Sequence, residues 1–178
     1  MKKNYSIWLW VIALSCFFAS CKKEREDTLP PATQTGAGTF GCKINGKVFI
    51  AKGSSGTGTP NPHIQYDIDL IGQPYLSIEA KRYEGTNVNG SALLFFLNVN
   101  RLGSYLIPSN FKYSVGWSSF ISGCGVGNLD TSVTAWGGGV ITRLDITNRI
   151  ISGTFDFKAL KPGCDTVRVT DGRFDIKF

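Results

Sequence analysis

Apolar and polar residues alternate with a period of two along most of the chain from Phe40 to its end. This alternation is typical of β-strands that bury one face, because successive side chains point to opposite sides of a sheet. Turn signals lie between the stretches: Asn45-Gly46 favours a type I′ hairpin, and Asp171-Gly172 indicates another turn. The stripes that we expect to face a core are Phe40, Cys42 and Ile44; Val48 and Ile50; Ile64, Tyr66, Ile68 and Leu70; Leu76, Ile78 and Ala80; Phe111, Tyr113, Val115 and Trp117; Val140, Thr142, Leu144 and Ile146; Ile151, Gly153, Phe155 and Phe157; Val167 and Val169; Phe174, Ile176 and Phe178.

The strand pattern predicts an all-β fold. No segment of comparable length has apolar residues at a helical spacing, so we expect little helix. Eight to ten short strands separated by turns are typical of an antiparallel β-sandwich or a small closed barrel, and the sequence does not decide between them. Residues 40–178 have the size of one globular domain.

The stretch ALLFFLNV, Ala92 to Val99, is apolar at nearly every position and so breaks the alternation. One interpretation is a central strand whose second face is covered by a loop or a short helix. The other is an exposed apolar patch for a ligand or a partner.

The first twenty residues have the features of a secretory signal peptide. Lys2 and Lys3 precede an apolar run from Ile7 to Ala19 that contains no charge. Thirteen residues are too few to span a bilayer, which needs roughly 20, but they suit the apolar region of a signal peptide.

Phe18, Ala19 and Ser20 lead into Cys21, and this stretch resembles the lipobox of bacterial lipoproteins. The resemblance implies that residues 1–20 are removed and that Cys21 becomes a lipid-modified N-terminus. The alternative is ordinary secretion, with Cys21 as one more thiol. Several acyl chains would hold the protein on a membrane, because each buried CH₂ contributes about 0.8 kcal/mol.

Residues 21–39 are rich in charge, Pro, Thr and Gly and have no apolar period, so we expect a lipidated N-terminus followed by a flexible tether. The charged residues directly after Cys21 are similar to the surface-export signals of Bacteroidota lipoproteins. This similarity implies a lipid-anchored protein of the cell outer membrane, on its periplasmic or its surface-exposed side.

Charge argues against a nucleic-acid partner. The chain has 19 Lys and Arg residues; without Lys2 and Lys3, 17 remain against 13 acidic residues, a net charge of +4. The basic residues are dispersed singly through the domain, without the clusters that bind phosphate backbones.

The cysteines divide by their surroundings. Cys16 leaves with the signal peptide, and Cys42 lies on the inward stripe of the first strand as a buried thiol. Cys124 and Cys164 lie in loops of a protein expected in an oxidising compartment, and we predict that they form a disulfide. Zinc-type spacing is absent, so we expect no metal site.

Catalytic patterns are weak. His63 is the only histidine and lies in a loop, so we predict no catalytic residues and no cofactor. Asp67 and Asp69 alternate on one strand and suit an acid pair or a hard cation, although such residues are usually the wet face of a strand. Trp117 and Trp136 suit an aromatic platform for stacking on sugars, although burial is the commoner fate of tryptophan.

Three stretches of the domain resemble a family of uncharacterised Bacteroidota lipoproteins, a domain of unknown function. They are GTFGCKINGKVFIA near residue 40, GGGVITRLDITNRIISGTFDFKA, and VTDGRFDIKF at the end of the chain. The resemblance implies a small all-β domain behind a lipobox, with no activity or site residue to carry over.

These observations predict a cell-envelope lipoprotein that is not an enzyme but a binding or interaction module, with a glycan or an envelope protein as partner. One alternative is a structural lipoprotein that docks on an envelope complex through ALLFFLNV. Another is a glycan hydrolase that uses the carboxylates of Asp67 and Asp69.

Overall fold

A computed structural model describes residues 27–54, 56–85, 87–106, 117–118 and 134–178. These residues form two antiparallel sheets and no helix, which confirms the predicted all-β fold. The six-stranded sheet has the order β2-β1-β10-β9-β8-β6, and the four-stranded sheet has the order β3-β4-β5-β7. Neither sheet closes on itself, so the sandwich is the correct member of the predicted pair. The strands are β1 (Thr39–Ile44), β2 (Lys47–Ile50), β3 (His63–Ile68), β4 (Pro74–Glu84), β5 (Asn87–Leu97), β6 (Gly103–Leu106), β7 (Trp117–Ser118), β8 (Thr134–Asp145), β9 (Ile150–Leu160) and β10 (Val167–Lys177).

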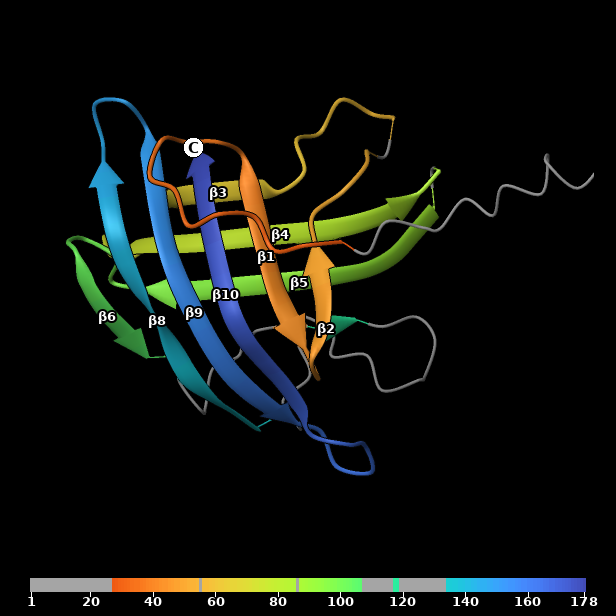
Figure 1. Ribbon diagram of the computed structural model, residues 1–178. Helices are drawn as coiled ribbons and strands as arrows, with labels where there is room; N and C mark the ends of the chain where they lie inside the picture. The colour runs from red at the N-terminus through yellow and green to blue at the C-terminus, as the bar shows by residue number, and fades with distance from the viewer. Residues whose placement is uncertain (1–26, 55, 86, 107–116, 119–133) are drawn as a thin grey trace, which may run out of the picture.

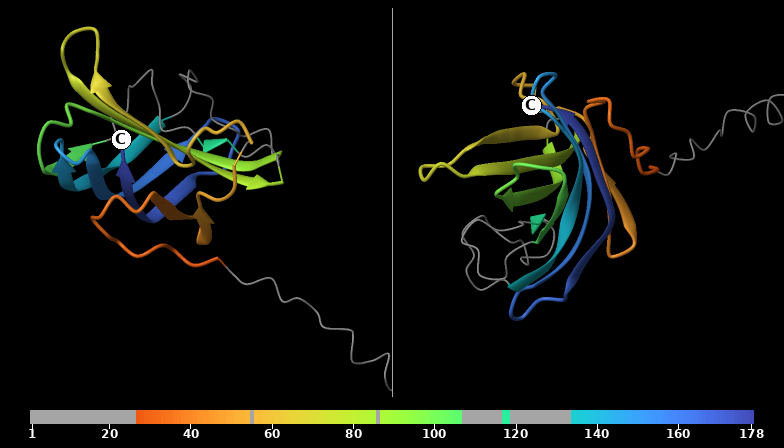
Figure 2. Two further views of the ribbon diagram at one scale, coloured as in Figure 1. Left: turned by 90° about the horizontal axis from the view of Figure 1, so that it is seen from above. Right: turned by 90° about the vertical axis from the view of Figure 1, so that its left-hand side faces the viewer.

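The two sheets form two layers whose strands cross steeply (Figure 1). The long strands β8, β9 and β10 curve over the four-stranded sheet (Figure 2). The β3–β4 hairpin of the four-stranded sheet extends beyond the edge of the six-stranded sheet. Each layer turns one apolar face inward, as expected of packed sheets. The outer face of the six-stranded sheet therefore takes no part in the packing between the two sheets.

The core between the sheets consists of side chains from alternate positions, as the sequence pattern predicts. On β4, Leu76, Ile78 and Ala80 are fully buried, and on β9 the buried stripe continues through Phe155 and Phe157. Aromatic rings fill much of the core, with Phe155 stacked on Phe40 at 5.2 Å between ring centroids. The inward-facing set is Phe40, Cys42, Ile44, Phe49, Leu76, Ile78, Ala80, Leu94, Phe96, Val99, Ala135, Ile141, Ile151, Phe155, Phe157, Ala159, Val169, Phe174 and Ile176.

The predicted hairpin at Asn45-Gly46 is confirmed, because both residues have positive φ angles, 48° and 82°, and link β1 to β2. The predicted inward stripe on β2 is wrong. Cys42 pairs with Phe49 across the hairpin, so Phe49 shares the buried face of Cys42, while Val48 and Ile50 are only half-buried.

Bulges explain the errors on the longer strands. A register shift between Ile141 and Arg143 buries Ile141 and leaves Val140 exposed, although the alternation placed Val140 in the core. Asp171-Gly172 is an irregularity inside β10 and not a turn, with Asp171 at φ 54°. An extra residue in one strand shifts the inward face by one position, which a strict period of two does not anticipate.

Strand β5 contains most of the ALLFFLNV stretch and lies between β4 and β7, as the central-strand interpretation requires. Leu94 and Phe96 point into the core and are almost fully buried. The side chains of Leu93 and Phe95, on which the covered-face and exposed-patch interpretations differ, lie outside the described part of the structure.

Residues 27–38, here called the strap, lie against the outer face of the six-stranded sheet (Figure 2). The Asp27 carboxylate is 2.6 Å from an Arg82 guanidinium nitrogen and 3.3 Å from Lys52 Nζ. Further along, backbone N–H groups of Thr35 and Gly36 donate to the carboxylate of Asp175. The prediction of a flexible tether through residue 39 is therefore wrong for the strap, while residues 21–26 lie outside the described part of the structure.

Candidate functional site

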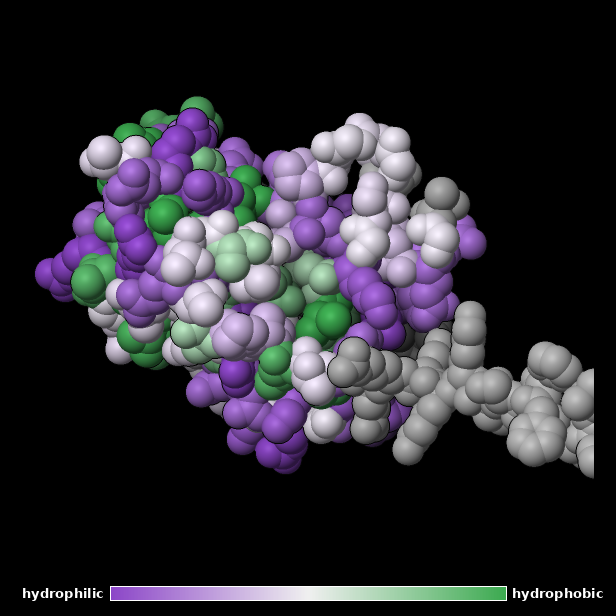
Figure 3. Space-filling model, turned by 45° about the horizontal axis from the view of Figure 1, so that its top comes forward, coloured by the Kyte–Doolittle hydropathy of each residue, from purple (hydrophilic) through white to green (hydrophobic). Residues whose placement is uncertain are grey.

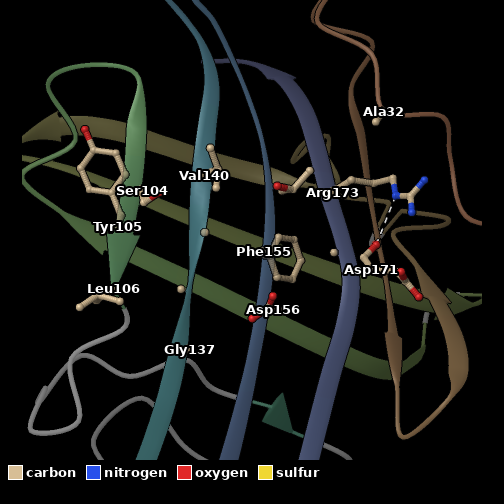
Figure 4. A pocket seen from close by; sticks show the side chains of 14 residues that line it. Ala32, Ser104, Tyr105, Leu106, Gly137, Val140, Phe155, Asp156, Asp171 and Arg173 are labelled. Atoms are coloured by element: carbon tan, nitrogen blue, oxygen red, sulfur yellow. Dashed lines mark hydrogen bonds between the residues drawn. The ribbon is translucent and has the colours of Figure 1, made fainter.

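Two adjoining hollows lie on the outer face of the six-stranded sheet, and together they are here called the outer groove. The larger, of about 720 Å³, lies between the strap and β6, with Ala32 on one side and Leu106 on the other (Figure 4). The smaller, of about 540 Å³, lies beside Trp136. Both hollows are lined by Gly137, Asp156 and Asp171, so the groove is continuous across β8, β9 and β10.

Trp136 is the large aromatic side chain of this groove. It belongs to β8 and is 43 % exposed, because alternation on β8 sends Ala135 inward and Trp136 outward. An exposed tryptophan on a sheet face offers a flat apolar surface and one N–H donor. This arrangement agrees with the predicted platform for Trp136.

Three glycines after Trp136 line the larger hollow with their backbone and are here called the glycine floor. A Cβ at Gly137, whose φ is 137°, would collide with the backbone oxygen of Asp156 on β9. A Cβ at Gly139 would lie 2.6 Å from Cζ of Phe96 in the core and 2.8 Å from the Thr154 oxygen. Gly137 and Gly139 face the core and allow β8 to approach its neighbours closely, while Gly138 pairs with Asp156 on the outer face and adds no side chain beside Trp136.

Two basic side chains stand in the same row as Trp136. Trp136 pairs with Lys158 on β9, and Lys158 pairs with Arg168 on β10. Within the described residues, neither the Lys158 ammonium nor the Arg168 guanidinium has an ion pair or a side-chain hydrogen bond. The row thus presents one aromatic ring and two positive charges to solvent.

The charge of Asp171, which lines both hollows, is already neutralised by a neighbouring cation. The Asp171 carboxylate lies 2.9 Å from Lys43 Nζ, and the hydrogen bond from Lys43, with its charge, lowers the pKa of Asp171. Arg173 Nε donates to the Asp171 carbonyl oxygen at 3.2 Å (Figure 4), and Arg173 also reaches the Pro30 carbonyl of the strap. Asp171 stays ionised at neutral pH and is not a proton donor.

The two tryptophans of the predicted platform lie in different sheets. Trp117 belongs to β7 of the four-stranded sheet, whereas Trp136 belongs to β8 of the six-stranded sheet. The side chain of Trp117 lies outside the described part of the structure, so a platform that uses both tryptophans stays a prediction.

The carboxylates of Asp67 and Asp69 do not form the predicted pair on one strand, because β3 ends at Ile68. Asp69 Oδ1 accepts hydrogen bonds from the backbone N–H groups of Ile71 and Gln73, at 3.0 and 2.8 Å, and so shapes the β3–β4 turn. Leu70, expected to face the core, is fully exposed in this turn. His63 opens β3 with an exposed side chain.

Cys42 is a buried thiol, as the sequence predicts. Cys42 is free and fully buried, and burial raises the pKa of its thiol to about 12. Cys21 and Cys124 lie outside the described residues. Lipid attachment at Cys21 and the disulfide between Cys124 and Cys164 therefore stay predictions.

Sequence reasoning missed the carboxylate of Asp175, which is 1 % exposed although it lies on the outer face. The donors to it, Thr33, Thr35 and Gly36, lie about 140 positions earlier in the sequence, so no local pattern joins them to Asp175. Sequence reasoning also missed Lys158 and Arg168 as a pair, because strand register is needed to place them opposite each other.

Apolar side chains form a second exposed surface. Ile68, Leu70 and Ile71 of the β3–β4 turn are 64 %, 106 % and 77 % exposed. Apolar side chains gather at the upper left of the space-filling view, at the end where this turn lies (Figure 3). Three exposed apolar residues within four positions of one turn form a local apolar patch of the kind that can mark a contact surface.

Among the described residues, no group of three or more His, Cys, Asp or Glu side chains has the arrangement of a metal site. In the same part of the chain there is no helix with the length and apolarity that a membrane crossing requires. No protein-family model, no curated protein and no solved structure matches this chain.

Proposed function

We propose that this protein is a lipid-anchored binding module of the cell envelope and that its outer groove binds glycan chains. The observation that carries the proposal is the exposed Trp136 beside the glycine floor and the charged row of Lys158 and Arg168. Sugar rings have apolar C–H faces and polar edges. A flat indole surface takes the face, while charged and backbone groups around it take the hydroxyls.

The groove supports binding better than catalysis. A glycosidase uses two carboxyl groups in different protonation states at the scissile bond. Of the two acids in the groove, Asp171 is ion-paired with Lys43 and its pKa is lowered, so Asp156 is left without an acidic partner for this task. The hydrolase alternative also loses Asp69, whose carboxylate is used in the β3–β4 turn.

The anchor belongs to the same proposal. The lipobox-like stretch before Cys21 and the resemblance to Bacteroidota lipoproteins support attachment to the outer membrane. Six peptide units separate Cys21 from Asp27, and a fully extended chain spans at most about 3.6 Å per residue. Because Asp27 is held by Arg82 and Lys52, the right-hand end of β4 in Figure 1 would stand within about 22 Å of the lipid-bearing Cys21.

A printed glycan array tests the binding proposal. The full chain, in detergent micelles, is applied beside a Trp136→Ala variant and a Trp136→Phe variant. We expect the natural chain to bind a subset of glycans, the alanine variant to lose them and the phenylalanine variant to keep part of the signal. Absence of any bound glycan, or equal binding by the alanine variant, would overturn the proposal.

A second candidate function is docking on an envelope protein through the β3–β4 turn, and the exposure of Ile68, Leu70 and Ile71 favours it. Leu94 and Phe96 of ALLFFLNV are buried in the core, so docking through that stretch would need its other face, and it stays a separate prediction. Co-purification of a stoichiometric partner from membranes, lost in a Leu70→Ser, Ile71→Ser double variant, would support docking. A glycan-binding chain without such a partner would exclude it.

A further inference from the structure

We infer that the outer groove selects polyanionic saccharide chains, which carry carboxylate or sulfate groups, and that Lys158 and Arg168 hold the anion while Trp136 holds the ring. This inference rests on the proposed glycan-binding function and adds the chemical class of the ligand. It is carried by the strand register around Trp136.

Lys158 and Arg168 face each other across β9 and β10 on the outer side of the sheet. Like charges in directly opposite positions destabilise an antiparallel pair. Within the described residues, no acid forms an ion pair with either side chain. Asp156 shares their face, but it stands two residues along β9 from Lys158, about 7 Å away at the rise of a strand. A fold gains nothing from this pair of charges, whereas a bound anion would relieve their repulsion.

The anion site lies next to the aromatic surface. Lys158 on β9 is paired with Trp136 on β8 and with Arg168 on β10. The aromatic ring and the two charges therefore form one row across three strands. All three residues line the smaller hollow. A sugar ring stacked on Trp136 would therefore direct an acidic substituent toward the two cations.

A third cation lies farther along the groove. The Arg173 guanidinium lines the larger hollow and donates hydrogen bonds to two backbone carbonyl oxygens, those of Asp171 and Pro30. The two hollows adjoin at Gly137 and Asp156. Positive charge at both ends of a continuous groove suits a chain with repeated acidic groups better than a single sugar ring.

Titration calorimetry of the full chain in detergent micelles tests this inference with three probes of similar length. They are an octagalacturonate, which carries carboxylates, a sulfated dextran octamer and an unmodified dextran octamer. We expect at least one anionic probe to bind about tenfold tighter than the neutral one at 20 mM salt. We also expect the difference to shrink at 300 mM salt, since exposed charges are screened.

A Lys158→Gln, Arg168→Gln double variant should lose about tenfold in affinity for the anionic probe. The matched control is a Lys47→Gln, Arg101→Gln variant, which removes two exposed charges that line neither hollow and should bind as the natural chain does. Thermal unfolding checks the fold: the groove variant should unfold at the same or a higher temperature, because it removes a like-charge pair.

The outcomes separate the two proposals. The carboxylate and sulfate arms identify which anion the groove takes, and tight binding of either one supports the inference. Equal affinity for neutral and anionic probes, with binding still dependent on Trp136, would overturn the inference and leave the glycan-binding function standing. An unchanged affinity in the groove variant would also overturn it. Absence of binding to all three probes and to the glycan array would overturn both.

Discussion

The hydroxyl of Thr33 donates a 2.6 Å hydrogen bond to Oδ2 of Asp175, which lies 142 positions later in the sequence. Oδ2 also accepts from the Thr35 N–H at 2.9 Å, and Oδ1 accepts from the Gly36 N–H and the Ser152 hydroxyl, both at 2.7 Å. Asp175 is thereby buried on the outer face of β10, and no Lys or Arg of the described ranges forms an ion pair with it. The strap is fixed to the sheet because its donors satisfy this carboxylate.

Replacing Asp175 by Asn should destabilise the fold by about 2 to 4 kcal/mol, because an amide group would turn N–H donors toward the donors of the strap. Urea unfolding followed by circular dichroism measures the change. Asp156→Asn is the matched control, since Asp156 is an exposed aspartate on the neighbouring strand, and it should change stability by less than about 0.5 kcal/mol. A loss for Asp175→Asn no larger than the loss for the control would contradict the role given to the carboxylate.

Stability should fall in acid. Burial opposes the charged form of Asp175, but hydrogen bonds from Thr33, Ser152 and the strap backbone outweigh it and hold the pKa well below its usual range. Asp145 also has a lowered pKa, through hydrogen bonds from Asn148 and Arg143. In the unfolded chain the pKa of aspartate is about 3.9, so near and below that pH the unfolded state binds more protons than the folded state.

The contribution of these carboxylates is therefore complete above about pH 5 and is lost progressively as the pH falls below about 4. Urea midpoints measured between pH 7 and pH 2.5 should show this decline, and the Asp175→Asn variant should show a shallower one. Equal slopes for the two proteins would mean that Asp175 is not held in its charged form by the fold.

The thiol of Cys42 should be unreactive in the native protein. It is fully buried and its pKa is raised to about 12, so almost no thiolate forms at pH 8. N-ethylmaleimide treatment followed by peptide mapping should find the Cys42 peptide unmodified before unfolding and modified after guanidinium is added. Rapid modification of Cys42 under native conditions would show that the first strand does not pack as described.

Attachment through Cys21 is tested by changing one residue. A Cys21→Ser chain should lose its acyl mass in mass spectrometry and should leave the membrane fraction, because the anchor depends on buried acyl chains. Cys42→Ser is a suitable control, since it also removes one thiol but lies in the core. A Cys21→Ser chain that stays in the membrane fraction, or a natural chain without acyl mass at Cys21, would refute the anchor.

Sequence patterns predicted those parts of the fold that depend on residues close together in the sequence. The alternation on β4 and β9 and the Asn45-Gly46 hairpin agree with the structure, because each depends on residues a few positions apart. The pattern failed at Val140 and at Asp171, where a bulge adds one residue and reverses the inward face. It failed again at the strap, where Asp175 is satisfied by residues about 140 positions away.

The candidate site was only partly visible in the sequence. Trp136 stood out as an aromatic residue beside three glycines. The row that joins it to Lys158 and Arg168 depends on the register of β8, β9 and β10, and their spacing in the sequence carries no sign of it. The exposed turn at Leu70 was hidden for a different reason, since an apolar residue in an alternating stretch indicates burial until the end of the strand is known.

Oxidative footprinting of Trp136 tests the central claim most directly. Hydroxyl radicals modify exposed side chains, and peptide mapping reports Trp136 separately from Leu70 and Ile71, which serve as exposed controls away from the groove. We expect saturating octagalacturonate to reduce modification of Trp136 several-fold while the turn residues stay unchanged. Modification of Trp136 that remains the same with octagalacturonate, sulfated dextran and plain dextran would contradict the claim that this face binds glycans.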